Sequence, residues 1–131
     1  MVNGIEKTAK DAVKRMIDEL GVNVLYLNYT SAGKDAYGQP VYVQKPYSLK
    51  GIVESLSLRD AKYVEAGYLP EHYLYFYFDS DDVTFAINKA KDEISYGGES
   101  YIIRNAFHYK INDTVVYVKL LCRRKEVKVN A

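Results

Sequence analysis

The stretch DEISYGGESYIIRNAFHYKINDTVVYVKLLCRR, residues Asp92–Arg124, decides the fold because it predicts two consecutive β-hairpins. Gly97-Gly98 separates two β-prone runs, and tight hairpin turns favour glycine because they need positive φ angles. Asn112-Asp113 predicts a second turn, since both residues tolerate the left-handed region and hydrogen-bond locally. We therefore expect a hairpin pair that shares its middle strand.

The alternation of side chains predicts how these strands are buried. The middle strand has one apolar face, interrupted by Asn105, and one more polar face. The last strand is apolar on both faces, which favours a central strand covered on two sides. The apolar face of the middle strand holds Tyr101, Ile103, Phe107, Tyr109 and Ile111, and the other face holds Arg104, His108 and Lys110.

Length and composition fit one domain over residues 1–131. A chain of this length buries roughly two-thirds of its unfolded surface, so it needs no metal or disulfide to hold a core. Hydrophobic residues make up 48% and charged residues 27%, which is ordinary for a globular protein. The 14 tyrosines are unusual, and they suit strands or wet protein interfaces because an apolar ring carries a hydroxyl that needs a partner.

Several function classes are disfavoured by the same numbers. A net charge of +1 argues against strong nonspecific binding to nucleic acid or membrane. The one cysteine, Cys122, lies in an apolar run, where a buried thiol is a better interpretation than a nucleophile. No apolar run approaches the ~18 residues that span a bilayer, and the first residues do not resemble a signal peptide. We expect synthesis inside the cell and no membrane partner.

Residues 1–21 predict an amphipathic helix. Asn3 suits the N-cap position, and Gly21 suits the position after the last turn. We expect the apolar face to pack on the chain's own sheet, with partner binding as the alternative, and the charged face to be solvated. The apolar face holds Ile5, Ala9, Ala12, Val13, Met16, Ile17 and Leu20, and the charged face holds Glu6, Lys7, Lys10, Asp11, Lys14, Arg15 and Asp18.

Residues 22–124 predict a mainly β (α+β) fold, a small antiparallel β-barrel or sandwich with a long inter-strand loop. Gln39-Pro40 and Lys45-Pro46 bracket a short extended piece that the prolines confine to an edge. Gly51 indicates a bulge or bend. The expected strands before the hairpin pair are Val22–Tyr29, Val41–Val43, Leu49–Leu58 and His72–Asp79, with loops at Thr30–Gln39 and Arg59–Pro70 and an acidic turn with a short helix or irregular crossover at Ser80–Lys91.

The run His72–Asp79 has two apolar faces. We assign the face of Leu74, Phe76 and Phe78 to the core. The opposite face is a stripe of three tyrosines, Tyr73, Tyr75 and Tyr77, which is too large to stay open on a monomer. The N-terminal helix or a neighbouring subunit is therefore expected to cover it.

The sequence predicts no catalytic, cofactor-binding or metal-binding residue. Gly97-Gly98 is not followed by the lysine of a phosphate loop. His72 and His108 have no cysteine or carboxylate at ligand spacing. The acidic turn Asp79–Asp82 resembles the opening of a calcium loop but lacks its glycine and glutamate, so a solvated turn is favoured.

Arg123, Arg124 and Lys125 lead into a basic tail, residues 125–131, and form the one charge cluster. A solvated chain end is the first interpretation. Contact with phosphates or with an acidic patch on a partner is the second.

Three phrases together resemble the head-completion or head–tail connector proteins of tailed viruses, the stopper or adaptor subunits between portal and tail. They are GVNVLYLNYTSAGKDAYGQPVYV (Gly21–Val43), LKGIVESLSL (Leu49–Leu58) and DEISYGGESYIIRNAF (Asp92–Phe107). The last phrase matches the family's order of Asp, any residue and Ile, followed by Gly, two residues, Tyr, any residue and Ile. Lys91 stands where the family has glycine.

This resemblance implies a structural virion protein of the neck region, assembled in the host cytoplasm. It implies a ring of six or twelve copies that contacts a portal or adaptor protein and a tail protein, with packaged DNA in the lumen. Loops Thr30–Gln39 and Arg59–Pro70 and the tyrosine stripe suit ring contacts. The interface residues we predict are Tyr63, Tyr68, Leu69, Tyr73, Tyr75 and Tyr77, and Arg123, Arg124 and Lys125 are candidates for DNA or partner contact.

Other functions remain as alternatives. A tail-completion or minor tail protein is close to the first hypothesis. A small nucleic-acid-binding β-barrel would bind in a salt-dependent manner through the basic cluster. An enzyme or small-ligand binder would need a pocket on the tyrosine-rich sheet.

Overall fold

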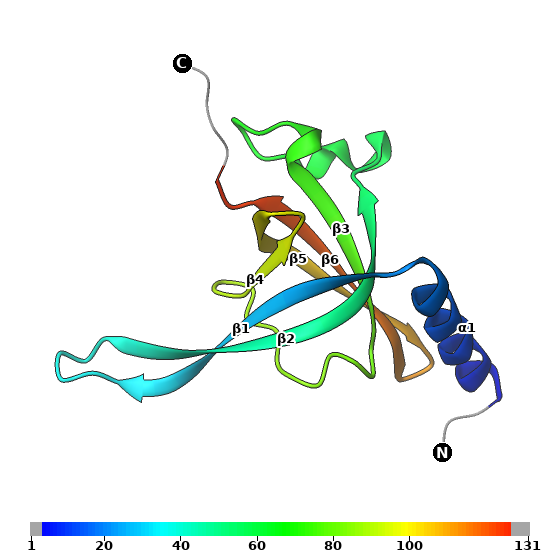
Figure 1. Cartoon of the computed structure of the whole chain (residues 1–131), viewed down its shortest axis with the longest axis horizontal. Helices are drawn as coiled ribbons and strands as arrows, with labels where there is room; N and C mark the ends of the chain where they lie inside the picture. Colours follow the sequence, from blue (N-terminus) through cyan, green and yellow to red (C-terminus); the bar gives the residue numbers. More distant parts are fainter. Residues whose placement is uncertain (1–3, 127–131) are drawn as a thin grey trace.

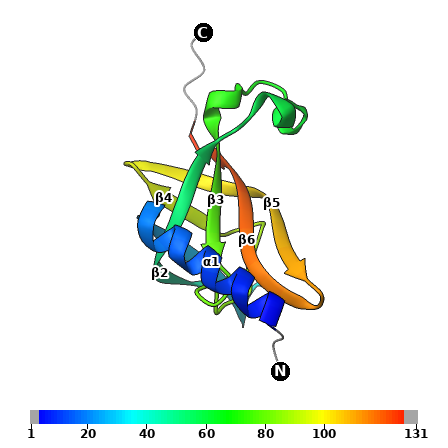
Figure 2. The same ribbon diagram turned by 90° about the vertical axis from the view of Figure 1, so that its right-hand side faces the viewer.

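The computed structural model describes residues 4–126 as a closed six-stranded antiparallel β-barrel with one N-terminal helix (Figures 1 and 2). Neighbouring strands follow the order β1-β2-β3-β6-β5-β4, and β4 pairs with β1 to close the barrel. The predicted fold class is confirmed, with the barrel realised rather than the sandwich. The elements are α1 (Gly4–Leu20), β1 (Val22–Lys34), β2 (Pro40–Ser55), β3 (Tyr73–Asp79), β4 (Glu93–Tyr96), β5 (Glu99–Ile111) and β6 (Thr114–Arg124), with 3-10 helices at Leu58–Tyr63 and Pro70–His72.

Both predicted hairpin turns are present. Gly97 and Gly98 join β4 to β5 with φ angles of 60° and 80°, and both values lie in the region that side chains rarely adopt. Asn112 joins β5 to β6 with φ at 54°. The turn chemistry of the sequence therefore fixed the positions of these three strands.

The predicted apolar face of β5 is wrong beyond Ile103, because a bulge interrupts the strand. Ile103 pairs with Cys122 and the next pair joins Asn105 to Leu121, so Arg104 is an extra residue on β5. After the bulge the two faces exchange. Phe107 packs outside the barrel, whereas Ala106 contacts its interior.

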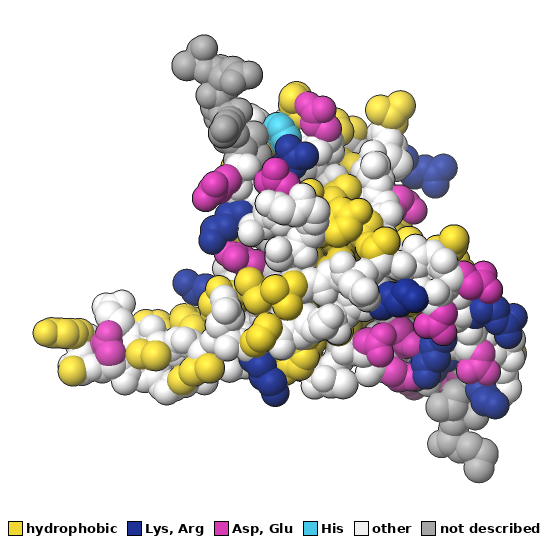
Figure 3. Space-filling view, viewed as in Figure 1, with side chains coloured by type: hydrophobic (Ala, Val, Ile, Leu, Met, Phe, Trp, Pro, Cys, Tyr) yellow, Lys and Arg dark blue, Asp and Glu magenta, His cyan; other side chains and the backbone are white. Residues whose placement is uncertain are grey.

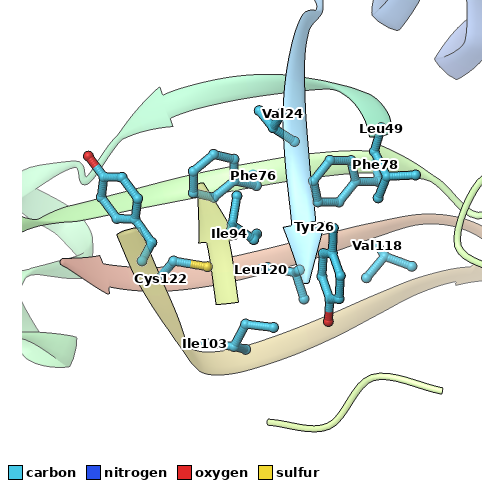
Figure 4. Close-up of a cluster of buried hydrophobic side chains, with 11 residues drawn as sticks. Val24, Tyr26, Leu49, Phe76, Phe78, Ile94, Ile103, Val118, Leu120 and Cys122 are labelled. Atoms are coloured by element: carbon cyan, nitrogen blue, oxygen red, sulfur yellow. The ribbon is translucent and has the colours of Figure 1, made fainter. Parts of the chain in front are cut away.

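The barrel interior is filled by alternate side chains from all six strands (Figure 4). As predicted, Phe76 and Phe78 of β3 are fully buried there. β6 is buried on both faces, also as predicted, with Leu120 inside and Leu121 outside. Residues 80–92 take the irregular form of the crossover that we expected. The ring of Phe85 in this segment stacks on Tyr47 with centroids 4.3 Å apart.

Gly51 allows a close approach of two strands rather than a bulge. The prediction was a bulge or a bend, and no bulge is present, because the β1–β2 register runs without a shift from Val22 opposite Gly51 to Ser31 opposite Tyr42. A Cβ at this position would lie 2.7 Å from the ring of Phe78. Glycine is therefore needed because the aromatic core fills the space a side chain would take.

α1 crosses the outside of the barrel and contacts β2, β3 and β6 (Figure 2). It uses only one edge of the apolar face that its sequence predicts, together with part of the predicted charged face. Glu6 and Ile17 are buried, and Val13 is half-buried. Asn112 of the β5–β6 turn donates a hydrogen bond to Glu6. No helix within residues 4–126 is long and apolar enough to cross a bilayer.

Candidate assembly surfaces

The first surface is a two-stranded arm, residues 30–43, that extends from the barrel (Figure 1). Pairing of β1 with β2 continues out to Lys34 opposite Pro40, where the sequence had predicted a loop and a short separate strand. β1 pairs with β4 only at Leu25–Leu27, and β2 pairs with β3 only at Ile52–Ser55. The outer edges of the arm are therefore unpaired within the described strands.

Local turn chemistry explains why the arm reverses at its tip. Oδ1 of Asp35 accepts hydrogen bonds from the backbone N–H groups of Tyr37 (2.8 Å) and Gln39 (2.9 Å). Gly38 has a φ angle of 77°, and Gly33 lies where the register shifts. The Asp35-x-x-Gly38 spacing is a local sequence signal for this turn.

The arm exposes apolar side chains (Figure 3). Tyr37 at the tip is 90% exposed, and Val43 is 52% exposed. Val41 is also exposed and shares a face with Val43, because side chains alternate along a strand. A two-stranded ribbon is marginally stable on its own, so the arm is a surface that gains stability from contact.

The second surface is the helix stripe, the exposed apolar residues Ile5, Ala12, Met16 and Leu20 of α1. Ile5 is 69% exposed and Leu20 is 66% exposed. The apolar face of α1 was expected to pack on the barrel. That expectation holds for Val13 and Ile17, which meet the barrel, and is wrong for the helix stripe, because Glu6 and Lys10 of the charged face take that side instead.

A buried carboxylate fixes the base of the arm to the crossover. Asp92 accepts hydrogen bonds from the Tyr26 hydroxyl (2.5 Å), the Asn28 side chain (2.9 Å) and the backbone N–H of Tyr29 (2.7 Å) and Asn88 (2.8 Å). Desolvation, together with the hydrogen bond to Asp92, raises the pKa of Tyr26 far above its ordinary value. The site of Asp92 is therefore structural and holds the base of the arm against the crossover.

The tyrosine stripe of β3 is covered mainly by residues 56–72, which we call the cover segment. Tyr73 and Tyr75 are only 1% and 2% exposed, and they pack with Tyr63 and Tyr68 of the cover segment. The expected cover, α1, reaches only the half-buried Tyr77. Tyr73 and Tyr75 are thus enclosed by their own chain and are not open to a neighbour.

Leu69 and Leu58 are the outward-facing apolar residues of the cover segment. Leu69, one of the predicted interface residues, is exposed, and Leu58 is more exposed still. Both side chains lie on the same segment that encloses Tyr73 and Tyr75. The cover segment therefore keeps part of the predicted interface available to a partner.

Glu65 holds the cover segment to the barrel. It forms ion pairs with Arg104 and Arg123 and accepts a hydrogen bond from the Tyr73 hydroxyl at 2.8 Å. Desolvation opposes its ionisation, but the hydrogen bonds from Tyr73, Arg104 and Arg123 outweigh it, so the pKa of Glu65 is lowered. Tyr75 adds a second link by donating to Asp60 at 2.8 Å.

The basic cluster is partly used inside the molecule. Arg123 pairs with Glu65 at 2.8 Å, and its guanidinium lies 3.9 Å from the ring centroid of Tyr68. Lys125 pairs with Glu93 at 2.6 Å. Nε of Arg124 is buried without a hydrogen-bond partner. The rest of the predicted basic tail, residues 127–131, lies outside the described residues.

The acidic turn joins α1 to the barrel. Asp81 pairs with Lys10 at 2.7 Å and with Lys14 at 2.9 Å, and hydrogen bonds from these two lysines lower the pKa of Asp81. Within residues 4–126, no three His, Cys, Asp or Glu side chains are placed to hold a metal ion. Cys122 is buried in the core, and burial raises the pKa of its thiol.

The fold and these surfaces define a small closed β-barrel with an outer helix, a cover segment and a projecting arm. No protein-family model matches the chain, and a comparison with curated proteins found no match. Among solved structures, the chain is similar to the solution structure of protein SF1141 from Shigella flexneri 2a, a structural genomics target. The TM-score is 0.54 at 14% identity, over 81% of this chain and 93% of that chain. This likeness shows the fold alone.

Proposed function

We propose that the chain is a structural virion protein of a tailed virus. It acts as a subunit of an oligomeric ring in the neck, which joins the portal to the tail and closes the DNA-filled head. The observation that carries the proposal is the arm, which exposes Tyr37, Val41 and Val43 beyond the barrel. The three family-like phrases fall on β1 with the arm, on the barrel half of β2, and on β4 with β5.

The surfaces of the molecule support a ring. A closed ring uses heterologous contacts, in which one surface of each subunit meets a different surface of the next. The arm and the helix stripe are two different apolar surfaces on one chain. The cover segment adds Leu58 and Leu69, which suit contact with the portal or tail protein above or below the ring.

Co-purification with a portal protein and a tail protein of a tailed virus tests the proposal. The chain is expected to bind at least one of them, and the complex is expected to hold several copies of the chain. The substitution Tyr37→Ser at the arm tip is expected to weaken binding or copy number, whereas Glu99→Gln in the β4–β5 hairpin is the matched control. A chain that binds neither protein would contradict the proposal.

The nucleic-acid-binding alternative depends on Arg123, Arg124 and Lys125, and two of these already form ion pairs within the chain. A tail-completion or minor tail protein would use the same surfaces as a connector. Binding to the tail protein without the portal would favour that second assignment.

A further inference from the structure

We infer that copies of the chain join head to tail, with the arm of one copy lying on the helix stripe of the next. The inference rests on the proposed function, because it names the two surfaces that build the ring. It commits both surfaces to one kind of partner, a second copy of this chain.

The placement of the two surfaces excludes contact between them within one chain. The arm and α1 lie on opposite sides of the barrel (Figure 1), so the arm cannot reach the helix stripe of its own chain. Asp92 and its partners fix the base of the arm, at Asn28 and Tyr29, to the crossover. The start of the arm is therefore held to the barrel on the side opposite α1, where it is open to a partner.

The two surfaces have complementary chemistry. Val41 and Val43 on the arm and Ile5 and Ala12 on α1 are small or medium aliphatic residues that are exposed. Charges of both signs border each surface, with exposed Lys34 and Asp35 on the arm and exposed Arg15 and Glu19 beside the helix stripe. Each rim can thus offer opposite charges to the other, which favours one register of docking.

A second copy is the occupant that satisfies both surfaces at once. A different protein on the helix stripe would leave the arm exposed, whereas each added copy covers one stripe and one arm. One free surface of each kind then remains at the two ends of a row of subunits, and these two surfaces meet when the rotation between subunits closes a ring.

A mixing experiment tests this contact. The arm variant carries Val41→Glu and Val43→Glu, the helix variant carries Ile5→Glu and Ala12→Glu, and Leu58→Glu on the cover segment is the control. Sedimentation at concentrations up to about 1 mM detects even weak association. The natural chain and the control are expected to form oligomers, and each double variant alone is expected to associate at least tenfold more weakly. An equimolar mixture is expected to form a heterodimer and nothing larger, because each variant keeps one intact surface.

The other outcomes overturn the inference. An arm variant or a helix variant that still assembles like the natural chain shows that copies join elsewhere. A natural chain that remains a monomer at this concentration also overturns it, while the connector proposal still stands if the chain binds portal or tail protein. Circular dichroism checks that the variants fold. If a double variant does not fold, Val43→Glu and Ala12→Glu are mixed as single substitutions and judged by the same results.

Discussion

At the scale of single residues, two carboxylates hold the irregular parts of this chain in place. Asp92 is 1% exposed and accepts four hydrogen bonds, from Tyr26, Asn28, Tyr29 and Asn88. Glu65 holds the cover segment to the outside of the barrel by pairing with Arg123 and accepting a hydrogen bond from Tyr73. Each carboxylate accepts hydrogen bonds from several donors. Removing either carboxylate leaves those donors without an acceptor, so substitution at either position is expected to destabilise the fold.

Asp92→Ala is expected to destabilise the fold by about 3 kcal/mol or more, because buried donors lose their acceptor. Urea unfolding measures this loss. The backbone N–H of Tyr29 and Asn88 are expected to exchange faster with solvent, since both donate to Asp92. Asp11→Ala on the exposed side of α1 is the control, with a change within about 0.5 kcal/mol. An equally small change for Asp92→Ala would show that its network does not stabilise the crossover.

Glu65→Gln is expected to reduce stability by about 1 kcal/mol at pH 7, since the site is partly solvated. The pKa of Glu65 is lowered in the folded chain from its ordinary value of 4.5. Its contribution is therefore complete above pH 4.5 and is lost as the pH falls through the folded pKa. The difference in unfolding free energy between the natural chain and Glu65→Gln should shrink on acidification below pH 4.5. A difference that stays constant with pH would contradict the assigned role, and Glu99→Gln serves as the exposed control.

At the scale of elements, local signals predicted more of the fold than long-range ones did. Glycine and asparagine turns placed β4, β5 and β6 correctly, because φ preferences act within a few residues. The bulge at Arg104 was missed, since nothing in the local sequence distinguishes an extra residue from an ordinary one. The face of α1 was predicted only in part, because Val13 and Ile17 meet the barrel as expected but Glu6 of the charged face does so too. Its docking depends on Glu6 meeting Asn112 and on Lys10 meeting Asp81, pairs far apart in sequence.

The candidate surfaces were predicted only in part. The sequence indicated that the tyrosine stripe needs a cover, but not that residues 56–72 provide it. Tyr73 and Tyr75 were predicted at an interface but are buried within the chain, whereas Leu69 is exposed. The arm was predicted as a loop at Thr30–Gln39 followed by a short strand at Val41–Val43. Gly33, Gly38 and Pro40 led to this prediction, because glycine and proline disfavour a continuous strand. Its turn chemistry at Asp35 was present in the sequence.

Gly51→Ala tests how tightly β2 packs on β3. The new methyl group would lie 2.7 Å from the ring of Phe78 and 2.8 Å from the carbonyl oxygen of Tyr77, so a loss of about 1–3 kcal/mol is expected in thermal or urea unfolding. Gly4→Ala is the matched control, because nothing lies within 4 Å of its added methyl group. That change is expected to leave stability equal or slightly higher. Equal stability of the two variants would show that β2 relaxes freely around Phe78.

At the scale of the whole molecule, the chain combines a rigid barrel with apolar surfaces on opposite sides. The core of the barrel is closed by Phe85 at the crossover, and the tyrosine face is enclosed by the cover segment. The arm, the helix stripe and the two leucines of the cover segment remain open, as do Val22, Leu25 and Tyr109 on the barrel. This distribution suits a subunit held by several neighbours at once, as a neck ring requires.

Particle imaging of the purified chain, alone and mixed with a portal and a tail protein of a tailed virus, tests the connector proposal most directly. The connector proposal predicts closed rings with a fixed number of copies, six or twelve, in which the arm of each subunit reaches its neighbour. Rings are expected on the portal or tail protein if they do not form without it. Single copies in every mixture, with the arm free in solution, would contradict the proposal.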